Sequence, residues 1–109
     1  MKTEIPIMTM TVLATAALVR SRFVTSSGAV PAAGGKVLGV ANADYSLGEQ
    51  AGVAVLGALV VEAGAAVALD DDVQSDASGR AITVASGSVA GRALDAATAA
   101  GQRIRVLMR

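Results

Sequence analysis

Hydrophobic and polar positions alternate in short runs along the chain, and Gly, Ser, Asn and Asp separate the runs. A period of two is that of a β-strand whose two faces meet different surroundings. Residues 70–79 are expected to be a polar loop, and residues 95–100 a turn because they are too few for a stable helix. The alternation predicts strands at 7–13, 18–25, 36–41, 50–61, 80–85, 88–94 and 102–108. The expected fold is mainly β, a small β-barrel or β-sandwich.

One segment of the chain recurs. Residues 35–41 return as residues 87–93, with four identities at alternate positions that lie 52 residues apart. Each copy leads through a loop to a glycine, Gly48 or Gly101, and then to an alternating strand. We therefore expect a duplicated strand–loop–strand unit inside a single β domain that covers residues 1–109. Gly52 and Gly57, inside the long run 50–61, are expected to mark bulges or tight bends, so that this run is two strands that meet at a corner.

The N-terminal segment, residues 1–17, is predicted to be either an extended arm or a first strand. Threonines alternate in it with methionine and valine, which is the period of a strand. The apolar run that follows Lys2 and ends in Ala-Thr-Ala at 14–16 also resembles an export signal. The alternative hypothesis is therefore a secreted or surface-exposed β module, although Glu4 stands where such a signal is positive.

The composition is apolar but built from small side chains. Hydrophobic residues make up 53% of the chain and aromatic residues only 2%. Ala and Val bury little area each, so a lone domain of this size would have a thin stability margin. An ordinary compact domain with an Ala/Val core is one interpretation. The preferred interpretation is that part of the apolar surface is buried only against partners, as in obligate oligomers.

The residue types present exclude much chemistry. Nine basic and nine acidic residues cancel, and the chain has no His and no Cys. We therefore expect neither nucleic acid nor a membrane as a partner, and neither a catalytic triad nor a thiol site. The cluster Asp70, Asp71, Asp72 and Asp76 matches a calcium loop only in part, and a solvated loop is expected. The sequence predicts no catalytic residue, no cofactor and no metal site, and hence a protein that is not an enzyme.

The C-terminal strand has two distinct faces. Ile104, Val106 and Met108 alternate with a basic set on the other side of the strand. That basic face is either plain solvated surface or the contact with an acidic surface of a neighbour or partner. The candidate interface residues are Arg103, Arg105 and Arg109.

In this order along the chain, several segments resemble one family. They are the Gly-Val-Ala strand within 35–41, the acidic loop 44–49, the strand 53–61, residues 64–70 before Gly79, and residues 91–94 followed by 103–106. Together they resemble the small capsid cement, or head decoration, proteins of tailed bacteriophages. Two departures are that residues 67–70 lack the aromatic side chains usual there and that the first 17 residues are unusually apolar.

The resemblance implies a structural virion protein. Such proteins form trimers of β-barrels or sandwiches on the outer face of an icosahedral head, where they hold capsomers together against the pressure of the packaged DNA. The implied partners are the chain itself and the major capsid protein. The implied location is the capsid exterior, after assembly in the host cytoplasm. The family brings no catalytic residues and no cofactor.

Overall fold

The computed structural model describes residues 4–108, and these form strands, turns and loops without a helix. None of the described residues therefore belongs to a helix that could span a membrane. The mainly β prediction is confirmed. The eight strands are β1 (Ile5–Leu13), β2 (Phe23–Val24), β3 (Gly39–Ala41), β4 (Gln50–Glu62), β5 (Asp72–Ser75), β6 (Ala81–Thr83), β7 (Gly91–Ala93) and β8 (Arg103–Met108).

The central strand β4 carries neighbours along both edges. Gly57 and Ala58 pair with both β1 and β8, and Val53 and Ala54 pair with both β1 and β3. Because a strand has two edges, β3 and β8 must share one edge of β4, and β1 occupies the other. Among the described strands β1 has no second neighbour.

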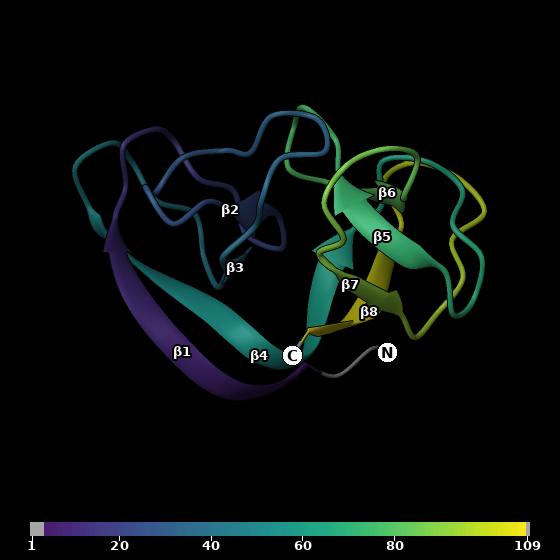
Figure 1. Cartoon of the computed structure of the whole chain (residues 1–109). Coiled ribbons are helices and arrows are strands. Elements are labelled where there is room, and N and C mark those ends of the chain that lie inside the picture. The colour runs from purple at the N-terminus through teal and green to yellow at the C-terminus, as the bar shows by residue number, and fades with distance from the viewer. Residues whose placement is uncertain (1–3, 109) are drawn as a thin grey trace.

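The C-terminal half closes into a small barrel. Antiparallel pairs join β4 to β8, β8 to β7, β7 to β5 and β5 to β6. A parallel bridge between Ala63 and Ala81 then brings β6 back to the end of β4. The N–H of Gly64 donates to the carbonyl of Ala81 at 2.8 Å at this closure. Figure 1 shows this barrel on the right, with β1 and β4 leaving it as a long curved ribbon.

The two strand–loop–strand copies expected from the sequence are present as β3 with the start of β4 and as β7 with β8. The structure extends them into two larger units that share β4. The first unit consists of β1, β2, β3 and the start of β4, and the second unit of the rest of β4 with β5, β7 and β8. In both units the pairing order is the same: β2 pairs with β3 and β3 with β4, as β5 pairs with β7 and β7 with β8. β1 corresponds to residues 54–62 of β4, which lie 49 positions later.

The correspondence extends to strained backbone. Ser21 and Asp70, also 49 positions apart, are the non-glycine residues with positive φ in the described chain, at 64° and 69°. Their N–H groups donate to the carbonyls of Ala41 and Ala93, which are equivalent positions of β3 and β7. Residues in this region of φ cost free energy unless the surroundings impose it. Because both units contain this turn at the same position, the turn is a feature of the repeated unit.

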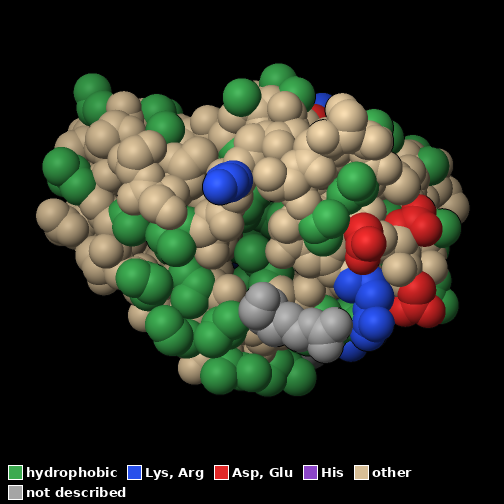
Figure 2. Space-filling view, viewed as in Figure 1, with side chains coloured by type: hydrophobic (Ala, Val, Ile, Leu, Met, Phe, Trp, Pro, Cys, Tyr) green, Lys and Arg blue, Asp and Glu red, His purple; other side chains and the backbone are tan. Residues whose placement is uncertain are grey.

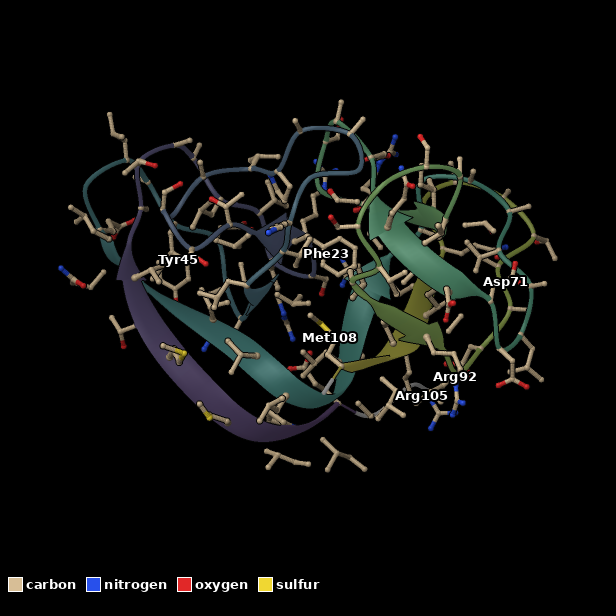
Figure 3. The ribbon with its side chains drawn as sticks, in the orientation of Figure 1. Phe23, Tyr45, Asp71, Arg92, Arg105 and Met108 are labelled. Atoms are coloured by element: carbon tan, nitrogen blue, oxygen red, sulfur yellow. The ribbon has the colours of Figure 1, made fainter. Side chains whose placement is uncertain are left out.

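Two hydrophobic clusters lie on opposite faces of β4. Val53 and Val55 face a cluster beneath the loops of the first unit, whereas Ala54 faces the barrel interior. Phe23 belongs to the first unit by sequence but is buried in the barrel cluster, with 1% of its surface exposed. In Figure 3 it lies at the junction of the two halves. It is the single Phe of the chain, and an aromatic side chain buries a large apolar area.

Two sequence-based expectations were wrong in detail. Residues 18–25 do not form one strand, because the positive φ of Ser21 turns the chain and only Phe23–Val24 pairs with β3. Residues 70–79 are not a loop throughout, because Asp72–Ser75 forms β5. In β5, the side chain of Gln74 is buried and accepts hydrogen bonds from the N–H groups of Ala85 and Gly87, both at 3.0 Å. The polar residues of β5 predicted a loop. Gln74 can nevertheless be buried in a strand, because its side-chain oxygen is hydrogen-bonded within the protein.

Of the two glycines expected to mark a bend, Gly57 does so, whereas Gly52 lies in the regular part of the pairing with β1. The φ of Gly57 is 113°, a region that residues with a Cβ rarely adopt. A Cβ at this position would also collide with the carbonyl oxygen of Ile5 on β1. The pairing register of β1 shifts between Pro6 and Met8, beside the same point. The bend therefore needs glycine both for its conformation and for the close approach of β1.

We predict that Gly57→Ala lowers the free energy of unfolding by about 2–4 kcal/mol, from backbone strain and steric collision together. Gly48→Ala is the matched control, because Gly48 also has positive φ, 89°, but a Cβ there would meet nothing within 4 Å. It should cost only the strain, about 1–2 kcal/mol. Urea unfolding followed by circular dichroism measures both. Equal losses in the two variants would contradict the collision with β1.

Candidate interaction surface

A basic face covers the outer side of β7 and β8. On β8, Ile104, Val106 and Met108 are buried while the alternating residues face outward. Arg92 of β7 pairs with Leu107 of β8 in register, so it lies on the same face as the outward residues. Figure 2 shows Lys and Arg side chains gathered here beside acidic ones, and Figure 3 shows Arg92 next to Arg105. We define the basic face as Arg92, Arg103 and Arg105.

Arg105 is already engaged within the chain. Its Nε and Nη2 atoms donate to the two carboxylate oxygens of Asp95 at 2.9 and 3.1 Å. The backbone N–H of Arg105 donates to the same carboxylate at 2.9 Å. The hydrogen bond to Asp95, with its charge, raises the pKa of Arg105 above the usual value. A bidentate pair of this kind fixes the turn that carries Asp95 to β8 rather than offering a free cation.

The other arginines of the face are more available. Arg92 lies 3.8 Å from a carboxylate oxygen of Asp70, and both side chains are well exposed. Arg103 is exposed and meets no carboxylate within residues 4–108. Its register partner Glu62 instead contacts Arg22 and Arg80 at 3.4 and 3.6 Å.

The three arginines predicted from the sequence as interface residues are not equally available for contact with a partner. Arg103 and Arg105 lie on one face of β8, but only Arg103 is uncommitted within residues 4–108. Arg109 lies outside the described residues. Sequence reasoning missed Arg92, although the repeat already placed the segment Gly91-Arg92-Ala93 on a strand.

A hollow of about 420 Å³ adjoins Arg103 at the start of β1. Arg20 and Arg103 both border it, together with Ser21 and Asn42. Glu4, also at its wall, accepts a hydrogen bond from the N–H of Val60 at 3.0 Å. The hollow therefore lies beside Arg103 of the basic face.

Two aspartates of the cluster at residues 70–76, Asp71 and Asp76, hold turns of the fold. One carboxylate oxygen of Asp76 accepts from the N–H groups of Ser78 and Arg80 at 2.8 and 2.9 Å. Asp71 accepts from the hydroxyl of Thr83 at 3.1 Å. These carboxylates close turns and connect β5 to β6. Within the described ranges, no group of three or more acidic side chains is arranged to hold a metal ion.

A second exposed surface is apolar and follows β1. We define the apolar margin as its exposed large hydrophobic side chains. Ile7 is 77% exposed, and the margin is visible in Figure 2 along the rim that β1 follows in Figure 1. These side chains lie on both faces of β1, since successive residues of a strand point to opposite faces, and exposed apolar side chains gathered along one strand mark a candidate interaction site. Its members are Ile5, Ile7, Met8, Met10 and Leu13.

The comparison with known families decides the class of protein. The model of the phage cement protein family matches residues 1–108. The chain belongs to the phage cement protein family. It is therefore a structural phage protein associated with the virion capsid, and the resemblance seen in the sequence is confirmed. The alternative of an exported module receives no support, and residues 5–13 of the supposed signal form a strand of the sheet.

Solved structures agree on the fold of this cement family member. The N base of the head fibre protein gp8.5 of bacteriophage phi29 is similar over 94% of this chain and 93% of that chain. The TM-score is 0.75 and the sequence identity 22%, so this likeness establishes the architecture alone. No curated protein sequence shows significant similarity.

We predict that Arg105→Gln lowers the urea midpoint of unfolding, because it removes the bidentate pair with Asp95 that fixes the turn before β8. The difference from the parent should shrink in 1 M salt, at which the Debye length is about 3 Å. Arg103→Gln is the control on the same face of the same strand, and it should leave the midpoint unchanged. A midpoint for Arg105→Gln equal to that of the control would show that the pair contributes nothing to folding.

Proposed function

We propose that this chain is a decoration protein that binds the outer face of an icosahedral phage capsid as a homotrimer and stabilises the contacts between capsomers. The observation that carries the proposal is the match of the cement family over residues 1–108. The N base of a phage head fibre, a protein named for its place on the head, has the same architecture. The partners are other copies of the chain and the major capsid protein.

The surface features of the chain suit such a role. The basic face offers Arg92 and Arg103, which are not tightly held by internal carboxylates, to an acidic surface of the capsid. Arg binds carboxylates in a planar fork, so a few contacts of this type fix orientation as well as adding affinity. The apolar margin is a separate surface on β1 and is available for contact between copies. We assign no catalytic role, cofactor, nucleic acid or membrane to the chain, and we place its assembly in the host cytoplasm.

The proposal predicts salt-sensitive binding to heads of the phage that encodes the chain. Purified heads that lack the chain are mixed with the parent, with the double variant Arg92→Gln/Arg103→Gln, or with the control Lys36→Gln, and are then sedimented. Lys36 is an exposed cation of the first unit, outside the basic face. Parent and control should sediment with the heads, and the double variant should bind at least about tenfold more weakly near 0.15 M salt, because interfacial charge pairs are lost.

Two results would count against this account. If the parent did not sediment with heads at any salt concentration, the decoration role would be wrong. If the double variant bound as well as the parent at both low and high salt, the basic face would be solvated surface, and the capsid contact would lie elsewhere on the chain.

Decoration should also stabilise the particle. A bound cement protein stabilises the assembled shell by mass action, since it binds the shell and not its separated subunits. Heads filled with DNA and saturated with the parent should release their DNA at a higher temperature than bare heads, as followed with a DNA-binding dye. An identical release temperature with and without bound protein would contradict the stabilising role.

A further inference from the structure

The outer edge of β1 is an open β-sheet edge. β1 is a nine-residue strand that pairs with β4 on one side and with no described strand on the other. Its register is regular from Thr9 to Leu13, and Ile5–Leu13 contains no charged residue. Natural proteins usually blunt such edges with charges, proline or bulges. Here Pro6 and the register shift beside it blunt only the first part, so the second part remains an available pairing site.

The backbone groups of this second part point outward. Thr11 lies opposite Gly52, and the carbonyl of Gly52 accepts from Asn42 on the side of β4 away from β1. In an antiparallel pair of strands, two residues that lie opposite each other without exchanging hydrogen bonds both direct their backbone N–H and carbonyl groups away from the partner strand. The N–H and carbonyl of Thr11 therefore point away from β4, toward the open edge of the sheet. Because this direction alternates along a strand, those of Leu13 point the same way.

The duplication shows what such an edge requires. Residues 54–62 of β4 are the equivalent of β1 in the second unit, and their corresponding edge is covered. Residues 54–58 pair with β1, the N–H of Val60 donates to Glu4, and the N–H of Glu62 donates to the carbonyl of Ser21 at 2.8 Å. Thr11 and Leu13 occupy the positions equivalent to Val60 and Glu62. Neither N–H donates to a group within residues 4–108, although the backbone of Gly28 packs against the carbonyl of Leu13. Residues 5–9, the equivalents of residues 54–58, have no described strand on their outer edge.

We propose that a strand of a second copy of this chain pairs with the outer edge of β1. The duplication points to a strand as the occupant, because residues 54–58 of β4, the equivalents of residues 5–9, are covered by a strand within the chain. Ile5–Leu13 carries no charge that would repel an approaching strand. The same contact would bury the apolar margin beside this edge. A chain with few large side chains in its core would thereby gain buried apolar area at the interface. This contact is the subunit interface of the homotrimer in the proposed function and rests on that part of it.

The test blocks the edge without touching the pairing of β1 with β4. Thr11→Pro removes an N–H that points outward, and Thr11→Val keeps it and is the matched control. Light scattering at micromolar concentration measures the mass, and urea unfolding checks the fold. The parent and Thr11→Val should have about three times the chain mass of 10.7 kDa, and Thr11→Pro should fall threefold, to the monomer.

A second pair of variants is independent of proline. Ile7→Lys places a charge on the most exposed residue of the apolar margin, and Val89→Lys places one on an exposed residue of the second unit, which is 57% exposed. A monomeric Ile7→Lys beside an oligomeric Val89→Lys supports the interface even if Thr11→Pro does not fold. Thr11→Pro and Ile7→Lys variants that both assemble like the parent would overturn it.

Sedimentation with heads separates this inference from the proposed function. A parent that is monomeric in solution overturns pairing with a second copy, whether or not it binds heads. If that monomer binds heads and Ile7→Lys does not, the edge of β1 takes a segment of the capsid instead. If the parent assembles through β1 but never binds heads, the interface stands and the decoration role fails.

Discussion

Everything in this fold depends on β4 being hydrogen-bonded along both edges at once. One edge carries β1, and the other carries β3 at Val53 and Ala54 and then β8 from Gly57 onward. The strand is the last of the first unit and the first of the second, so neither unit has a complete sheet without it. The bend at Gly57 allows one strand to serve both units, because it turns β4 from the ribbon with β1 into the wall of the barrel. A straight β4 could not belong to both.

This sharing also explains a composition rich in small residues. Where the units meet, backbone approaches backbone, and a Cβ on either Gly34 or Gly87 would collide with the Cα of the other. Gly39 and Gly91, which are equivalent in the two units, leave no room for a Cβ beside the neighbouring strand. Close packing of this kind excludes large side chains over much of the interior. Phe23 is the largest fully buried side chain, and the apolar margin remains exposed outside.

The sequence predicted the β class, the repeat and the bend because each leaves a local mark: alternation, identities at a fixed spacing, and a glycine inside a strand. It could not predict β5, because the burial of Gln74 depends on backbone groups of Ala85 and Gly87 that are distant in sequence. It identified the basic strand β8 but not that Arg105 is held by Asp95, since that pair forms across a turn whose shape the sequence does not specify. The sequence also could not predict the open edge of β1, because the residues of a strand do not show whether one or both of its edges are paired.

The central claim, that the two units fold as one through β4, can be tested with the single tyrosine of the chain. Tyr45 lies in the first unit, and no Trp obscures its fluorescence. Leu59→Ala removes a fully buried side chain of β4 inside the barrel of the second unit, at a cost of about 2–5 kcal/mol. Under urea, the fluorescence of Tyr45 should show a midpoint lowered by the same amount as the circular dichroism of the whole chain. An unchanged Tyr45 midpoint beside a lowered circular dichroism transition would show that the units fold separately.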